Sequence, residues 1–154
     1  MRPQLTQSQF ILLVEDNQDD YEATCRAFGK ANLRNPIVWC KSGRDALDCL
    51  KQQGAYRDAS NGSRAGLVLL DLNMPGMDGR KTLDVIKHDD ALKQIPVIIL
   101  TTSADERDVH ACYQMGANSY VQKPVSFDGL IEAIGRLKAY WFEIALLPKE
   151  AGYE

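Results

Sequence analysis

The feature that most constrains the fold is an alternation of short apolar runs with longer stretches of helical spacing. Five runs are rich in β-branched and aromatic residues, as strands are, and they cover 10–14, 36–40, 66–71, 96–101 and 118–123. Apolar residues recur at helical spacing in the stretches that follow them, over 18–31, 43–53, 79–88, 105–115 and 127–141. The runs lack a polar alternation, which indicates strands buried on both faces of a parallel sheet. The sequence therefore predicts a doubly wound (βα)5 α/β domain, with helices on both faces of a five-stranded parallel sheet.

Polar residues and one loop mark the boundaries of these elements. Side chains that favour the N-cap position precede four of the helical stretches: Ser42, Asp78, Ser103 and Ser126. The stretch 54–66 is rich in Gly, Ser, Asn and Asp, as exposed connections are. We therefore expect helices to begin just after the four caps, and a loop to precede the third strand.

Length and composition exclude several classes of protein. The 154 residues, 45% hydrophobic and 25% charged, fit one globular domain, which we place at 10–141, between a flexible segment at 1–9 and an apolar extension at 142–154. A net charge of −3 shows no basic excess, so we expect no nucleic-acid partner. Apolar runs such as 10–14 and 96–100 are too short to span a membrane, and 1–9 lack the apolar core of a signal peptide. We therefore expect a cytoplasmic protein with no membrane partner.

Charged and hydroxyl side chains gather where the predicted strands end. In open α/β sheets, sites form beyond the carboxyl ends of the strands, and those ends carry Glu15, Asp16, Asp71, Thr101 and Lys123. Carboxylates brought together repel one another unless a cation lies among them, and oxygen ligands suit Mg²⁺. A carboxylate beside Mg²⁺, a lysine and a hydroxyl is arranged to attack a phosphoryl group and form an aspartyl phosphate. The rim of the sheet therefore predicts a magnesium-dependent phosphoryl acceptor.

Each of these residues also has an ordinary structural interpretation. Glu15 and Asp16 suit the start of a helix, Asp71 could be an N-cap, Thr101 is common in strands and Lys123 is common at surfaces. What favours function is that all of them fall at the same rim of one sheet.

Four segments resemble the receiver domain of two-component response regulators. They are VEDN (14–17), LLDLNMPGMDG (69–79), PVIILTTSADE (96–106) and GANSYVQKP (116–124), and the resemblance extends from residue 9 to about residue 140. It implies a flavodoxin-like fold and a phosphoryl group received from a sensor histidine kinase. It also implies that the chain is a signalling protein whose chemistry is limited to its own phosphorylation and dephosphorylation.

The resemblance assigns roles around the phosphoacceptor, which it places at Asp71. Asp16 and Asp71 would ligate Mg²⁺ directly, Glu15 would act through a bound water, and Asn73 would offer its backbone carbonyl. Glu at position 15 replaces the commoner Asp of the family and leaves the metal site complete. The resemblance therefore implies that the magnesium and phosphorylation site is complete.

The resemblance also assigns a switch. Thr101 would move toward the phosphoryl group, Lys123 would pair with a phosphoryl oxygen, and the ring of Tyr120 would turn inward as Thr101 moves. Pro124 is similar to a cis-proline that shapes the following loop. Two positions would tune hydrolysis of the phosphoryl group: Asn73 and Ser103. The expected output is a changed surface on the helix at 105–115, the strand at 118–123 and the helix at 127–141.

The segment 138–154 is too apolar for a single helical face. We expect a partner surface there, most economically in a symmetric homodimer, formed by Trp141, Phe142, Leu146 and Leu147. The alternative is that these side chains fold back as a lid on the domain. FILLVEDNQDD (10–20) and WFEIALLP (141–148) are similar to single-domain regulators paired with cyanobacterial phytochromes. That narrower resemblance implies a light-sensing histidine kinase as the partner, docking near 18–24 and the loop after Lys123.

Two other functions are open at this point. A phosphatase of the haloacid dehalogenase type also passes through an aspartyl phosphate, but it needs a second acid two residues past the nucleophile, where this chain has Asn73. A phosphorylation-independent adaptor or dimerisation module would not need the acidic site, and burying unused like charges costs stability.

Overall fold

The computed structural model describes residues 9–56, 64–74, 76 and 78–145. One parallel sheet has the strand order β2-β1-β3-β4-β5. Its strands are β1 (Phe10–Val14), β2 (Ile37–Cys40), β3 (Ala65–Leu70), β4 (Val97–Thr101) and β5 (Ser119–Gln122). The helices are α1 (Gln18–Lys30), α2 (Gly43–Lys51), α3 (Gly79–His88), α4 (Glu106–Met115) and α5 (Phe127–Ala139), with a 3-10 turn η1 (Gly54–Tyr56) and a π-helical turn η2 (Tyr140–Ile144). The predicted five-stranded, doubly wound parallel α/β fold is confirmed.

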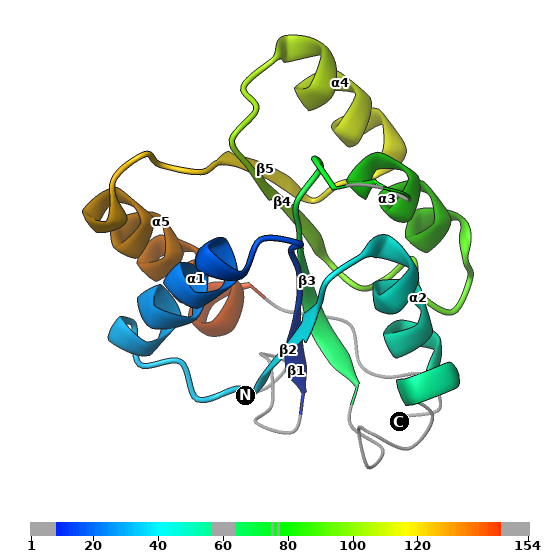
Figure 1. The fold of residues 1–154 in the computed structure, drawn as a ribbon, viewed down its shortest axis with the longest axis horizontal. Helices are drawn as coiled ribbons and strands as arrows, with labels where there is room; N and C mark the ends of the chain where they lie inside the picture. The colour runs from blue at the N-terminus through cyan, green and yellow to red at the C-terminus, as the bar shows by residue number, and fades with distance from the viewer. Residues whose placement is uncertain (1–8, 57–63, 75, 77, 146–154) are drawn as a thin grey trace.

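Helices cover both faces of the sheet, with α1 and α5 on one face and α2, α3 and α4 on the other (Figure 1). Side chains alternate along each central strand, so Leu12 and Val14 of β1 join the core under α2, α3 and α4, whereas Ile11 and Leu13 join the core under α1 and α5. Every residue of β1, β3 and β4 is buried. This double burial explains why the strand runs show no polar alternation.

Side-chain caps fix where the helices begin. Ser42, Asp78 and Ser126 each accept a hydrogen bond from the backbone N–H three residues on, as expected for N-caps. The prediction for Ser103 is wrong, because α4 begins later and its N-cap is Asp105, whose side chain accepts from the backbone N–H of Arg107 at 2.8 Å. Ser103 lies in the loop before α4, and its hydroxyl donates to Asp108 instead.

The end of the described chain returns to the core. The apolar stripe of α5, through Leu130 and Ile134, continues into η2, where the Trp141 side chain is 9% exposed and joins the same cluster. Phe142 is half-buried and packs against that cluster. Trp141 therefore belongs to the core of this chain, contrary to the partner surface predicted for it. The other predicted surface residues, Leu146 and Leu147, lie outside the described residues.

None of the helices in the described part of the chain has both the length and the apolar character that a bilayer span requires.

Candidate functional site

The three predicted carboxylates meet at the carboxyl ends of β1 and β3. Glu15 and Asp71 extend the sheet by one residue each, with backbone N–H donation from Glu15 to Cys40 at 3.0 Å and from Asp71 to Val14 at 3.1 Å. One ligand oxygen from each of Glu15, Asp16 and Asp71 lies within 4.8 Å of the others. Glu15 and Asp71 are buried, whereas Asp16 is exposed and leaves the cluster open to solvent. This all-oxygen donor set fits a divalent cation.

Lys123 brings a positive charge to the carboxylates from the loop after β5. Its Nζ donates to Glu15 Oε1 at 2.6 Å and to Asp20 Oδ2 at 3.2 Å, and only 10% of its side chain is exposed. Its backbone N–H donates to the Thr101 carbonyl at 2.7 Å, which ties this loop to the end of β4. Sequence reasoning missed Asp20. A signal that could have found it is its place in the acidic first turn of the helix predicted over 18–31, directly after the strand end that carries Glu15 and Asp16.

Burial and charge act in opposite directions on the Glu15–Lys123 pair. Burial raises the pKa of Glu15 to about 7, although the hydrogen bond and charge of Lys123 work to lower it. Burial alone would lower the pKa of Lys123, but the hydrogen bond and charge of Glu15, helped by Asp71 and Asp20, outweigh it and raise that pKa. A cation among the carboxylates would favour their charged forms. A cation bound beside Glu15 would therefore lower its raised pKa and favour the ionised carboxylate.

Two aromatic residues support the turn that carries Glu15 and Asp16. Trp39 on β2 donates its indole N–H to the Glu15 carbonyl at 2.7 Å. Its ring stacks on Tyr21 of α1 with centroids 3.9 Å apart and planes 5° apart, and Lys41 Nζ lies 4.8 Å from the Trp39 ring centroid. Sequence reasoning missed this support, because it joins a strand and a helix that neither periodicity nor motif relates.

The chain doubles back directly after Asp71. The Asn73 backbone N–H donates to Asp71 Oδ1 at 3.4 Å and its side-chain amide donates to Thr101 Oγ1 at 3.5 Å, so Asn73 connects the acceptor to the predicted switch hydroxyl. A Cβ on Gly79 would lie 2.2 Å from the Asp71 carbonyl oxygen, so α3 can begin against this backbone only with glycine there. The turn and the helix start thus fix the Asp71 backbone from both sides.

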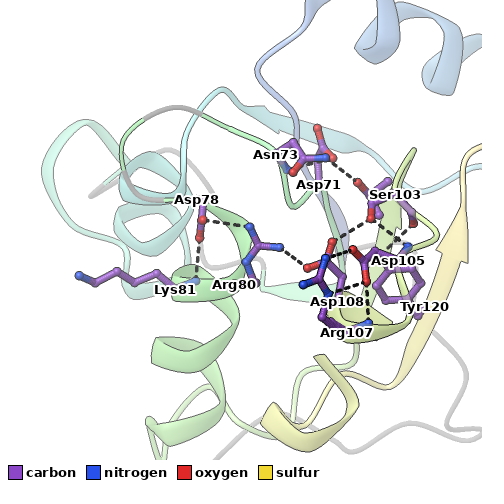
Figure 2. A network of polar contacts seen from close by, with 11 residues as sticks. Asp71, Asn73, Asp78, Arg80, Lys81, Ser103, Asp105, Arg107, Asp108 and Tyr120 are labelled. Atoms are coloured by element: carbon purple, nitrogen blue, oxygen red, sulfur yellow. Dashed lines mark hydrogen bonds and ion pairs between the residues drawn. The ribbon is translucent and has the colours of Figure 1, made fainter. Parts of the chain in front are cut away.

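The residues beyond Thr101 form a second polar network (Figure 2). Tyr120 on β5 donates its hydroxyl to the Ser103 carbonyl at 2.9 Å, and the Ser103 hydroxyl donates to Asp108 Oδ2 at 2.8 Å. Arg80 of α3 donates to the other Asp108 oxygen, Oδ1, also at 2.8 Å. The predicted tuning residues Asn73 and Ser103 therefore have separate partners in this structure.

The loop after Lys123 differs from its prediction. No peptide bond among the described residues is cis, so the cis bond predicted before Pro124 is wrong. The trans form is the lower-energy isomer of an X–Pro bond, and it places the Pro124 ring against the first turn of α5, where a Cβ on Gly129 would lie 2.9 Å from Pro124 Cβ. Pro124 still contacts the next element directly.

Fold and site together define a class of signalling protein. Residues 11–135 match the family model described as the response regulator receiver domain. The chain belongs to the response regulator receiver family, a family of signalling proteins.

Particular relatives cover nearly the whole chain. It is 37% identical over 138 residues to Response regulator Rcp1 of Synechocystis sp., covering 90% of this chain and 92% of Rcp1, and the Mn(2+)-bound structure of Rcp1 superposes with a TM-score of 0.83. The phosphorylated cyanobacterial phytochrome response regulator RcpA superposes with a TM-score of 0.85 at 35% identity, covering 92% of this chain and 99% of RcpA. A probable methanogenesis regulatory protein, FilR2 of Methanothrix harundinacea, is 38% identical over 131 residues, covering 85% of this chain and 82% of FilR2.

Proposed function

We propose that this protein accepts a phosphoryl group from a sensor histidine kinase onto Asp71 in the presence of Mg²⁺, and signals through the face formed by α4, β5 and α5. The observation that carries this proposal is the meeting of Glu15, Asp16 and Asp71 within 4.8 Å, with the buried Lys123 ammonium bonded to one of them. Such a cluster of like charges is costly unless a cation or a reaction uses it.

The residues around Asp71 suit attack on phosphorus. An Asp71 oxygen forms the new P–O bond as the bond from phosphorus to the donor's leaving group breaks. Asp16 and Asp71 would hold Mg²⁺ directly, Glu15 through a water and Asn73 through its carbonyl. When bound, Mg²⁺ supplies charge neutralisation at the phosphoryl oxygens. Lys123 turns from its carboxylate partners toward a phosphoryl oxygen. Its ammonium is then the second positive charge, after Mg²⁺, that neutralises the phosphoryl oxygens.

The switch follows from the contacts of Thr101 and Tyr120. A phosphoryl group on Asp71 attracts the Thr101 hydroxyl away from Asn73, and the loop between β4 and α4 follows, because Thr101 precedes it directly. Tyr120 responds to the movement of that loop because its hydroxyl donates to the Ser103 carbonyl. A partner that prefers the shifted face then selects the phosphorylated state.

The proposal also names the kind of kinase and the face that would form a homodimer. The similarity to RcpA, a cyanobacterial phytochrome response regulator, supports a phytochrome-type kinase. We place both proteins in the cytoplasm, with the kinase docking against the first turns of α1 and the loop after Lys123. A homodimer would use the α4-β5-α5 face. Phosphotransfer from a purified phytochrome kinase, monitored in the light and in the dark, tests the first part, and sedimentation before and after phosphorylation tests the second.

The acceptor itself is tested by intact mass. Wild type, Asp71→Asn and a surface control, Asp84→Asn, are incubated with acetyl phosphate and Mg²⁺. We expect one added phosphoryl group on wild type and on the control, none on Asp71→Asn, and none on any protein after chelation of Mg²⁺. Equal labelling of Asp71→Asn would refute the assignment of the acceptor.

A further inference from the structure

Ser103 is held by three hydrogen bonds in the loop that connects β4 to α4, the longest of them from the Asp105 backbone N–H to the Ser103 hydroxyl oxygen at 3.3 Å. Its backbone carbonyl accepts from the Tyr120 hydroxyl at 2.9 Å, and its own hydroxyl donates to Asp108 Oδ2 at 2.8 Å (Figure 2). Ser103 is two residues past Thr101, whose hydroxyl contacts Asn73 beside Asp71. Ser103 is therefore only two residues from Thr101 of the proposed site, yet its hydroxyl is bonded to a side chain of α4.

Asp108 is itself fixed by a second helix. Arg80 on α3 donates to Asp108 Oδ1 at 2.8 Å, so each carboxylate oxygen of Asp108 has one short partner. The two side chains are 34% and 27% exposed, which is partial shielding from solvent. Arg80 also lies 3.5 Å from Asp78, the N-cap of α3. A continuous set of contacts thus runs from the start of α3, through α4, to the loop beyond Thr101.

The Asp108 bond removes the Ser103 hydroxyl from chemistry at Asp71. A hydroxyl that donates its hydrogen to a carboxylate at 2.8 Å is in a strong, charge-assisted bond, and it cannot donate the same hydrogen to a water or a phosphoryl oxygen. Hydrolysis of an aspartyl phosphate needs a water placed opposite the P–O bond that breaks. Freed from Asp108, the Ser103 hydroxyl could turn toward that water.

We propose that Asp108, oriented by Arg80, is a positioning residue that prolongs the life of the phosphoryl group on Asp71 by holding the Ser103 hydroxyl away from it. The inference rests on the proposed function. In the step it controls, a water oxygen bonds to phosphorus, the bond to the Asp71 oxygen breaks, the carboxylate is regenerated in its ionised form, and both hydrogens of the water leave with inorganic phosphate.

The test measures the first-order loss of the phosphoryl group by intact mass after the phosphodonor is removed. We expect Asp108→Ala to shorten the half-life about fivefold, which corresponds to about 1 kcal/mol for the lost hydrogen bond. Arg80→Ala should shorten it by a smaller factor and add nothing to Asp108→Ala. The matched controls are Glu106→Ala and Arg107→Ala, exposed neighbours in the first turn of α4 that carry the same charges.

A double-mutant cycle separates positioning from general loosening of the loop. In the Ser103→Ala background, Asp108→Ala should leave the half-life unchanged, whereas in Ser103→Thr, which keeps the hydroxyl, the shortening should return. An unchanged half-life in Asp108→Ala, an equal effect of Glu106→Ala, or an undiminished effect in Ser103→Ala would each overturn the proposal. If wild type gains no phosphoryl group at all, the proposed function fails first and this inference falls with it.

Discussion

Under the proposed function, Asp20 would compete with the incoming phosphoryl group for the charge of Lys123. The ammonium lies 3.2 Å from Asp20 Oδ2 and 2.6 Å from Glu15 Oε1, which uses two of its three N–H donors, so a phosphoryl oxygen would share the ammonium with both carboxylates. Asp20 also adds negative charge beside a site where negative charge accumulates during the proposed reaction. We therefore predict that Asp20→Asn raises the fraction of protein phosphorylated at a fixed, subsaturating concentration of phosphodonor.

The exposure of Asp20 limits the size of the effect. Its side chain is 48% exposed, so the pair belongs with solvent-screened ion pairs, which contribute about 0.2–1 kcal/mol. Converted to a ratio of phosphorylated to free protein, that is an increase of about 1.4-fold to about fivefold. The Glu15 bond to Lys123 is present in both proteins and cancels in the comparison.

The assay is intact mass at steady state with acetyl phosphate and Mg²⁺, at low ionic strength, where screening is weakest. Asp19→Asn is the matched control, because Asp19 is the exposed neighbour of Asp20 in the first turn of α1 and undergoes the same change of charge. The reasoning is refuted if Asp20→Asn is phosphorylated no more than wild type. It is also refuted if Asp19→Asn shows the same increase, since the effect would then come from net charge.

Three further changes test the fold and the metal site. Gly79→Ala should lower the free energy of unfolding, measured in urea, by about 1–3 kcal/mol, because the new Cβ overlaps the Asp71 carbonyl. The control is Gly135→Ala, where the site is open. That substitution should leave the free energy of unfolding unchanged or raise it by up to about 1 kcal/mol. Trp141→Ala should lower the free energy of unfolding by about 3 kcal/mol, because the side chain packs in the core. A loss below about 1 kcal/mol would contradict the core assignment. Because burial raises the pKa of Glu15 to about 7, Mg²⁺ affinity by calorimetry should fall as pH drops below that value, approaching tenfold per pH unit, and Glu15→Gln should flatten this dependence.

The sequence predicted the elements well because their signals are local. The bounds of β1 and α3 agree with prediction to the residue, since one is a continuous apolar run and the other begins at a capping aspartate. The meeting of Glu15, Asp16 and Asp71 was predictable too, because the carboxyl ends of neighbouring parallel strands share one rim.

The errors and omissions depend on tertiary contacts. The sequence predicts an N-cap at Ser103 because serine suits that role, and only the position of Asp108 shows where the Ser103 hydroxyl bonds. The spacing 130, 134, 137, 141 allows Trp141 to continue the apolar stripe of α5, and its packing in the same buried cluster as Leu130 and Ile134 favours that alternative over a partner surface. Trp39 supports Glu15 across the edge of the sheet, through a hydrogen bond between residues 24 apart in sequence.

Under the proposed function, the contacts of Lys123 would link a change at Asp71 to the α4-β5-α5 face. Its side chain is shared by Glu15 and Asp20, while its backbone N–H is bonded to the Thr101 carbonyl at 2.7 Å. If the ammonium moves toward a phosphoryl oxygen, that backbone bond couples the movement to the end of β4, where Thr101 is drawn to the same group. The ends of β4 and β5 would then shift together. Both shifts would displace Tyr120, because it lies on β5 and its hydroxyl bonds to the loop after β4. A Lys123 substitution should therefore uncouple the α4-β5-α5 face from Asp71 even where phosphorylation itself persists.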